Sequence, residues 1–300
     1  MRSIGSPADS PQKDMKPAIH RSKTVHYWNF GFIPTGSLRD DLRGKLFGHP
    51  NLLKRLQARE IIGALHLQPS DIALDLGCGA GFFTIEMAKL AQRAYGIDIN
   101  PYVKEIVVPQ ALRGRLEYIQ VSAERLPFPE GHFDKVLASE VLPMIPDPHR
   151  FLEEIRRVLK SGGRLVIANG AGHPDIEEAY RRRPLVFRWL QKRYPDQMPA
   201  SYQEYCTLLQ SSFGTSQRRF FQEGDIRSLL EENGFRSIHF DYSPGHLFGL
   251  YFSWSQFLLY LRTGRTISQE NFPLKFCLFS LIRPFERRKF RGGLLCVAQK

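Results

Sequence analysis

Residues 73–84 read ALDLGCGAGFFT, an apolar run that ends in a carboxylate and then passes through Gly77, Gly79 and Gly81. A buried strand followed by such a turn and a helix brings bare backbone to the carboxyl end of a parallel sheet, where nucleotide-like ligands bind. A glycine-rich turn that holds no ligand is the alternative. The stretch therefore predicts a strand, a tight turn and a helix, and it raises the question of what lies against the turn.

Several kinds of ligand compete for this turn. A phosphate-binding P-loop needs Gly-Lys-Ser/Thr at the helix entry, which the sequence GAGFFT lacks. A dinucleotide fold needs G-x-G-x-x-G, but Phe82 stands at the third glycine position. In the remaining pattern, D-x-G-x-G-x-G, Asp75 favours a cationic ligand, and S-adenosylmethionine carries an ammonium and a sulfonium. Asp98, in the next apolar run, is then expected to accept hydrogen bonds from the ribose hydroxyls.

The rest of the chain alternates short apolar runs with helical patterns up to about residue 170. Such alternation implies βαβ units and a buried parallel sheet, so the fold class is α/β. A helix over residues 50–67 is expected to cover the core, and a short or irregular helix is expected between residues 100 and 115 because Pro101 and Pro109 interrupt it. Later, Asp225 and Gly234 are expected to begin and end a helix, and strands follow at residues 235–243 and 292–300.

The sequence resembles the class I S-adenosylmethionine-dependent methyltransferases, and within them the branch similar to ubiquinone and menaquinone C-methyltransferases and other small-molecule enzymes. The resemblance covers about residues 61–168 and rests on LDLGCGAG, GIDIN, VSAERLPFPEGHFDKVLASEVL and FLEEIRRVLKSGGRLVIA. It implies a Rossmann-like, doubly wound, seven-stranded sheet whose last strand is antiparallel, with helical insertions.

The resemblance also implies a cofactor site for S-adenosyl-L-methionine. The expected residues lie on the glycine turn and after the following strands: Asp75, Gly77, Gly79, Gly81, Asp98, Ile99, Ala123, Glu124 and Ser139. Asp75 is expected near the ammonium, Asp98 at the ribose and Ile99 against adenine. Ser122 stands where many relatives carry Asp, which weakens the expected contact to the adenine amino group.

Catalysis of methyl transfer places few demands on side chains, because aligning the acceptor with the methyl group is the main requirement. A base is needed only for acceptors that hold their proton firmly. The candidates by position are Glu140, His149, His173 and Tyr27, and a structural or exposed role is the alternative for each. No metal site is expected from the spacing of the histidines. Cys78 is expected to be a small apolar residue, and Asp134 a structural one.

The composition favours an anionic partner, since 42 Lys and Arg stand against 30 Asp and Glu. The absence of a long apolar run and of an apolar leader predicts a cytoplasmic protein without a transmembrane helix. Residues 1–23 are expected to be a flexible tail, and residues 24–300 one methyltransferase domain. Helical insertions at about 171–216 and 244–291 are expected to form a substrate cap.

The second insertion has about 48 residues, with eleven aromatic residues and eight basic residues against two acidic ones. It predicts a cap that touches an anionic membrane or admits a lipophilic acceptor, and a packed helical subdomain with solvated charges is the alternative. The expected function is methyl transfer to a small lipophilic acceptor, at oxygen or carbon. The alternatives are a non-catalytic cofactor-binding protein that holds a partner or membrane and, less favoured, an RNA methyltransferase.

Overall fold

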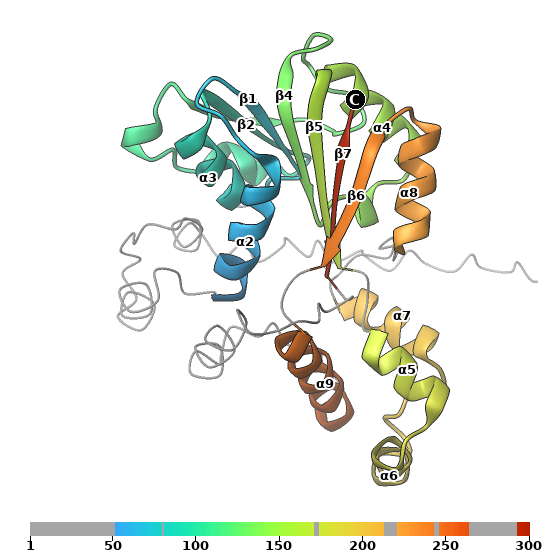
Figure 1. Cartoon of the computed structure of the whole chain (residues 1–300). Coiled ribbons are helices and arrows are strands. Elements are labelled where there is room, and N and C mark those ends of the chain that lie inside the picture. Colours follow the sequence, from blue (N-terminus) through green and yellow to red (C-terminus); the bar gives the residue numbers. More distant parts are fainter. Residues whose placement is uncertain (1–51, 80, 171–173, 213–220, 243–245, 264–292) are drawn as a thin grey trace, which may run out of the picture.

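The computed structural model describes residues 52–79, 81–170, 174–212, 221–242, 246–263 and 293–300 (Figure 1). The predicted tail of residues 1–23 and the candidate base Tyr27 lie outside these ranges. The elements in chain order are α2 (Leu52–Leu65), β1 (Ile72–Leu76), α3 (Phe82–Leu90), β2 (Arg93–Asp98), the 3-10 helices η2 (Pro101–Glu105) and η3 (Gln110–Leu112), β3 (Leu116–Gln120), β4 (Phe133–Ser139), the 3-10 helix η4 (Leu142–Met144), α4 (Pro148–Val158), β5 (Leu159–Gly170), α5 (Pro174–Arg182), α6 (Leu185–Arg193), α7 (Tyr202–Ser212), α8 (Glu223–Glu232), β6 (Arg236–Tyr242), α9 (His246–Thr263) and β7 (Gly293–Gln299).

The strands form one seven-stranded sheet in the order β3-β2-β1-β4-β5-β7-β6. Strands β1 to β5 are parallel to one another, whereas β7 runs antiparallel between β5 and β6. The strand order reverses beside β1, and ligands bind at such a reversal in open α/β sheets. The predicted α/β fold with an antiparallel last strand is thus confirmed.

Helices cover both faces of the sheet, because successive side chains of its buried strands point to opposite faces. On β4, Val136 and Ala138 belong to the core on the side of α4 and α8, and Leu137 to the core on the side of α2 and α3. Figure 1 shows these two helix pairs on either side of the sheet. The core therefore consists of two apolar layers separated by the sheet.

Two local predictions need correction. Residues 100–115 contain two short 3-10 helices in place of one helix. Pro101 begins the first and Pro109 precedes the second, and each removes a backbone donor that a longer helix would need. The N-cap of α8 is Gln222, not Asp225. Asp225 instead accepts a hydrogen bond from the Gln222 backbone N–H at 2.8 Å, as the acidic member of a capping box.

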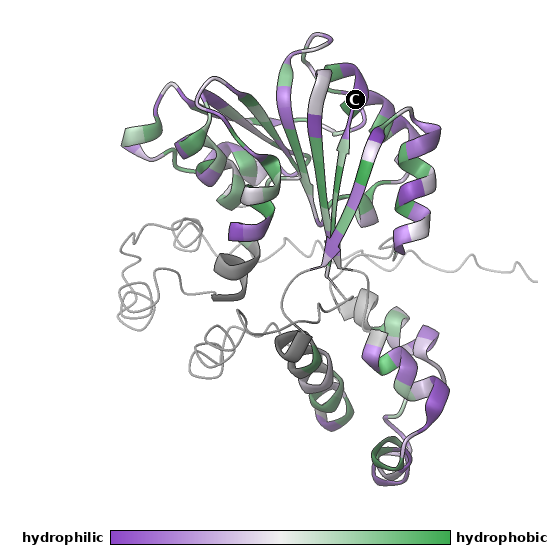
Figure 2. Ribbon diagram, viewed as in Figure 1, coloured by the Kyte–Doolittle hydropathy of each residue, from purple (hydrophilic) through white to green (hydrophobic). Residues whose placement is uncertain are grey.

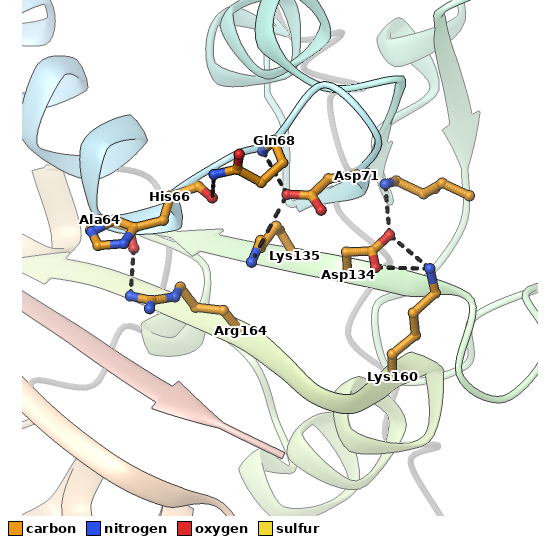
Figure 3. A network of polar contacts seen from close by, with 9 residues as sticks. Ala64, His66, Gln68, Asp71, Asp134, Lys135, Lys160 and Arg164 are labelled. Carbon is orange, nitrogen blue, oxygen red and sulfur yellow. Dashed lines mark hydrogen bonds and ion pairs between the residues drawn. The ribbon is translucent and has the colours of Figure 1, made fainter.

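The edge of the sheet where β1, β4 and β5 begin is held by polar contacts that do not involve the glycine turn (Figure 3). Asp134 accepts hydrogen bonds from the Ile72 backbone N–H at 2.9 Å and from Lys160 Nζ at 2.8 Å. Asp71 accepts from the Gln68 backbone N–H at 2.8 Å. Asp134 therefore has the structural role that the sequence predicted for it.

Helices α5, α6, α7 and α9 form a separate unit, here called the helical lobe (residues 174–212 and 246–263). Its core is apolar and rich in aromatic rings: Ile176, Ala179, Phe187, Leu190, Tyr205, Phe257 and Leu261. The lobe thus joins parts of the two predicted insertions. Figure 1 shows it beyond the end of the sheet where β5 leads into α5. Within the described ranges, none of the helices is both long and apolar enough to cross a bilayer.

Candidate functional site

The glycine turn connects β1 to α3 at the carboxyl edge of the sheet and is tied to β2. The Cys78 backbone N–H donates to the Ile97 carbonyl at 2.8 Å, and the Gly79 N–H donates to Asp98 Oδ2 at 3.0 Å. The other oxygen of Asp98 accepts from the Asn100 N–H at 2.9 Å. The ends of β1 and β2 are therefore linked, and the carboxylate of Asp98 lies next to the turn as predicted.

The three glycines of the turn all have positive φ, but they are required for different reasons. An added Cβ at Gly77 would lie 2.5 Å from Val141 Cγ2, and one at Gly81 would overlap the ring and hydroxyl of Tyr118. At Gly79, no heavy atom of the described chain lies within 4 Å of that Cβ position. The protein's own side chains thus exclude larger residues at two positions, whereas Gly79 leaves room for something outside the chain.

Asp75 is buried beneath the turn, with 1% of its surface exposed. Its Oδ2 accepts a hydrogen bond of 2.6 Å from the Thr84 hydroxyl in the first turn of α3. Burial raises the pKa of Asp75 to about 7, and the nearby charge of Asp98 acts in the same direction, against the lowering effect of the Thr84 hydrogen bonds. This carboxyl therefore changes its charge near neutral pH.

We expect Asp75 to make the stability of the ligand-free protein depend on pH. A carboxyl whose pKa is higher in the folded than in the unfolded chain contributes stability below the unfolded value, and that contribution is lost as pH rises through the folded value. With a pKa that shifts from 3.8 to about 7 on folding, the loss between pH 5 and pH 8 should be roughly 2.5 kcal/mol. Urea unfolding of wild type and Asp75→Asn over this range measures it, and the variant should show the smaller decline. Parallel declines would contradict the assignment.

Comparisons with known proteins agree with the observed fold and with the glycine turn. A family model described as "Methyltransferase domain" matches residues 74–167. The chain is 29% identical over 196 residues to the demethylmenaquinone methyltransferase of Lactiplantibacillus plantarum, over 61% of this chain and 77% of that one. It is 23% identical over 256 residues to a sterol 4-C-methyltransferase of Caenorhabditis elegans, over 79% of this chain and 72% of that one.

A structural relative is the geranyl diphosphate C-methyltransferase of Streptomyces coelicolor, whose crystal structure contains S-adenosyl-L-homocysteine. It has a TM-score of 0.50 and 15% identity, over 82% of this chain and 79% of that one, and so supports the fold. The chain carries a class I S-adenosylmethionine-dependent methyltransferase domain. It is an enzyme of the small-molecule type with S-adenosyl-L-methionine as its cofactor, as the sequence predicted.

The described residues of the methyltransferase fit this cofactor. Gly79 presents backbone without a neighbouring side chain, and Asp98 presents a partly exposed carboxylate beside it. Ile99 follows β2, and 70% of its surface is exposed, which is unusual for an isoleucine. It thus offers an apolar surface to the adenine ring of the cofactor. Cys78 is buried, and because burial raises the pKa of its thiol, it stays neutral and serves as the small apolar residue that was predicted.

The remaining predicted residues lie at or just after the ends of β3 and β4. Ala123 packs against the core, and the backbone N–H of Glu124 donates to Ser122 Oγ at 3.3 Å. Ser139 ends β4, and Glu140 follows with a φ of 58°, a left-handed conformation that is rare outside glycine. Each of these assignments to the cofactor or to catalysis remains a prediction.

The candidate base His149 lies on α4, where its described contacts are with the end of α8. Its Nδ1 lies 3.2 Å from the Asn233 amide, and its Nε2 lies 3.7 Å from Glu232 Oε2. Among the residues with described positions, the glycine turn is not a partner of this side chain. A contact between α4 and α8 accounts for His149 without catalysis. His173 lies outside the described residues.

Sequence reasoning missed Thr84, Tyr118 and Asn169. The Tyr118 hydroxyl donates to the Gly81 carbonyl at 3.1 Å and so braces the turn from β3. Asn169 is 3% exposed at the end of β5, and neither atom of its amide has a hydrogen-bond partner in the part of the chain described. A signal for Asn169 was present, because an amide at the end of the apolar run RLVIANG departs from the pattern of a buried strand.

Proposed function

We propose that the methyltransferase transfers a methyl group to oxygen or carbon of a small, lipophilic acceptor that carries a hydroxyl or carbonyl group. S-adenosylmethionine, when bound, supplies an electrophilic methyl group on its sulfonium. The chain's task is then to hold donor and acceptor in line, and alignment of this kind accounts for much of the rate of such reactions. Gly79 and Asp98 are the residues we propose for holding the donor, with Asp75 beneath them.

The observation that carries the acceptor part of the proposal is the buried amide of Asn169. An amide without partners in a protein interior costs about 1–3 kcal/mol, so it calls for a partner that completes its hydrogen bonds. Asn169 lies where β5 ends, one residue beyond Ala168, whose carbonyl accepts from the Glu140 N–H at 2.7 Å. It is thus at the same sheet edge as the predicted catalytic residue Glu140, and a hydroxyl or carbonyl of the acceptor would satisfy it.

The lipophilic character of the acceptor is supported by the names of two relatives. The relatives are named for demethylmenaquinone and for sterol 4-C-methylation.

The proposal is tested by incubating the full-length protein with methyl-labelled S-adenosylmethionine and a total lipid extract. Mass spectrometry should find the label in an apolar product that also carries an oxygen function. Label found only in water-soluble metabolites or in RNA from a parallel incubation would contradict the lipophilic acceptor.

Asn169→Leu separates a binding role from a structural one. Since the variant removes an unpaired buried amide, we expect its free energy of unfolding to rise by about 1 kcal/mol or to stay unchanged. At the same time its kcat/KM for the acceptor should fall at least about tenfold, because one lost hydrogen bond to the acceptor has that size. Steady-state kinetics with the labelled product and urea unfolding measure the two effects.

The matched control is Ile167→Leu, which lies two positions earlier on the same strand and therefore faces the same side of the sheet. Ile167 belongs to the apolar core, so a change of shape at constant volume should cost less than about 1.5 kcal/mol and leave turnover as in wild type. If Asn169→Leu lowers turnover no more than this control does, the amide does not hold the acceptor.

A further inference from the structure

Helix α6 has a face of large apolar side chains that the described chain leaves uncovered. Leu185 is 81% exposed, Val186 56% and Trp189 59%. At 3.6 residues per turn these three positions fall within roughly 100° of the helix circumference, so they form one continuous stripe. Single exposed apolar residues are ordinary on a protein surface, whereas three neighbours on one helix indicate a contact surface.

The opposite face of α6 fixes the helix to the lobe. Phe187 and Leu190 are buried, and the Phe187 ring stacks on Phe257 of α9 at a centroid distance of 6.0 Å. The exposed stripe is therefore presented by a helix whose other side is packed. Figure 1 shows α6 at the end of the lobe farthest from the sheet.

Basic side chains surround the stripe. Arg188, Lys192 and Arg193 lie on α6 itself, and none of the described carboxylates forms an ion pair with them. Arg181 and Arg182, at the end of α5, share Glu178. Figure 2 shows hydrophobic and hydrophilic residues side by side on α6. The surface thus combines uncovered apolar groups with an excess of positive charge.

We propose that this α6 face, with Leu185, Val186 and Trp189 at its centre and Arg188, Lys192 and Arg193 around it, docks on an anionic membrane surface. A helix of this composition places its apolar side chains among lipid head groups while the basic residues contact acidic lipids. Aliphatic Leu185 and Val186 favour lipid over RNA, because bases stack on planar rings and the stripe has only Trp189 of that kind.

This proposal differs from the sequence-based expectation, which assigned membrane contact mainly to residues 244–291. In the described part of that insertion, Phe257 and Leu261 of α9 are buried and Trp254 and Tyr260 pack against them, so these side chains serve the core of the lobe. The α6 face extends the proposed function, since a membrane-bound position would bring the enzyme to a lipophilic acceptor. The docking proposal is argued from the geometry of the lobe alone, so its test does not depend on which acceptor the enzyme methylates.

Flotation with vesicles of phosphatidylcholine, with and without phosphatidylglycerol, tests the proposal on the full-length protein. Wild type should float with the anionic vesicles only. Trp189→Ala should lower the fraction bound to anionic vesicles about tenfold, because it removes the largest apolar side chain of the stripe. The double reversal Arg188→Glu with Lys192→Glu should lower it by at least about the same factor. All these side chains are exposed, so the thermal midpoint of each variant should match that of wild type.

The control is Leu90→Ala, which removes an exposed leucine (49%) at the end of α3, outside the lobe. It should bind anionic vesicles as wild type does. Equal binding of Trp189→Ala and wild type, equal binding to neutral and anionic vesicles, or salt-dependent binding to RNA with no flotation would each overturn the proposal. Methyl transfer to an acceptor dispersed in detergent should persist in Trp189→Ala, which separates a failure of docking from a failure of the proposed chemistry.

Discussion

Asp98→Ala should lower the affinity of the protein for S-adenosylhomocysteine at least about 100-fold, because two hydrogen bonds from ribose hydroxyls to a carboxylate are worth about 1.5–3 kcal/mol each. Asp98 ends β2, and its two oxygens already orient the Gly79 and Asn100 backbone N–H groups. The substitution therefore removes both the ligand's acceptor and a support of the turn. Isothermal titration calorimetry measures the loss directly.

The matched control for this variant is Glu117→Ala on the neighbouring strand β3. Glu117 forms an exposed ion pair with Arg93 at 2.7 Å, and such pairs contribute about 0–1 kcal/mol. Its removal should leave both folding and cofactor affinity close to wild type. Asp98→Ala protein that is folded by circular dichroism and binds the ligand within about threefold of wild type would show that this carboxylate does not hold the ribose.

Gly81→Ala should destabilise the protein by about 3 kcal/mol, as the sum of a left-handed backbone at a non-glycine residue and a steric overlap in a packed region. Gly81 has a φ of 80°, and an added Cβ would collide with the hydroxyl and the ring of Tyr118. Gly79→Ala has the same kind of backbone cost with open space around the Cβ, so it should lose only about 1 kcal/mol. Urea unfolding of the two variants compares them.

A double variant identifies the source of the difference. In a Tyr118→Leu background the ring is gone, so Gly81→Ala should cost about 2 kcal/mol less than it does in the wild-type background. A cost that is the same in both backgrounds would mean that the Tyr118 ring is not what makes glycine necessary at position 81.

The succession of strands and helices along the chain could be predicted from the sequence, because buried strands and covering helices differ in apolar periodicity. The seven-stranded sheet with an antiparallel last strand was implied by the family resemblance. The exceptions have local causes. Pro101 and Pro109 split one expected helix into two short 3-10 helices. Asp225 is the third residue of α8 and not its N-cap, because the side chain of Gln222 accepts the hydrogen bond from the backbone at the start of the helix. Boundaries of this kind depend on single hydrogen bonds and are not visible in a periodic pattern.

The part of the site that could be predicted lies on β1, the glycine turn and β2, which follow one another in the sequence. Asp75, Gly79 and Asp98 come from the ends of two consecutive strands, and they meet as expected. Tyr118 was missed because the residue that requires Gly81 is 37 positions away and reaches it only through the pairing of β2 with β3. The sequence predicted that the two insertions form one cap, but it did not show which of their helices touch, since helices α5 and α9 meet only in the folded chain.

The central claim is that the open backbone at Gly79 and the carboxylate of Asp98 receive the methyl donor. The most direct test is a calorimetric titration of the purified protein and of Gly79→Ala with S-adenosylhomocysteine. Wild type should bind one equivalent, and the variant, although folded, should bind at least about tenfold more weakly because its methyl group occupies the space of the ligand. No heat of binding to the wild type, or equal affinity in both proteins, would contradict the account.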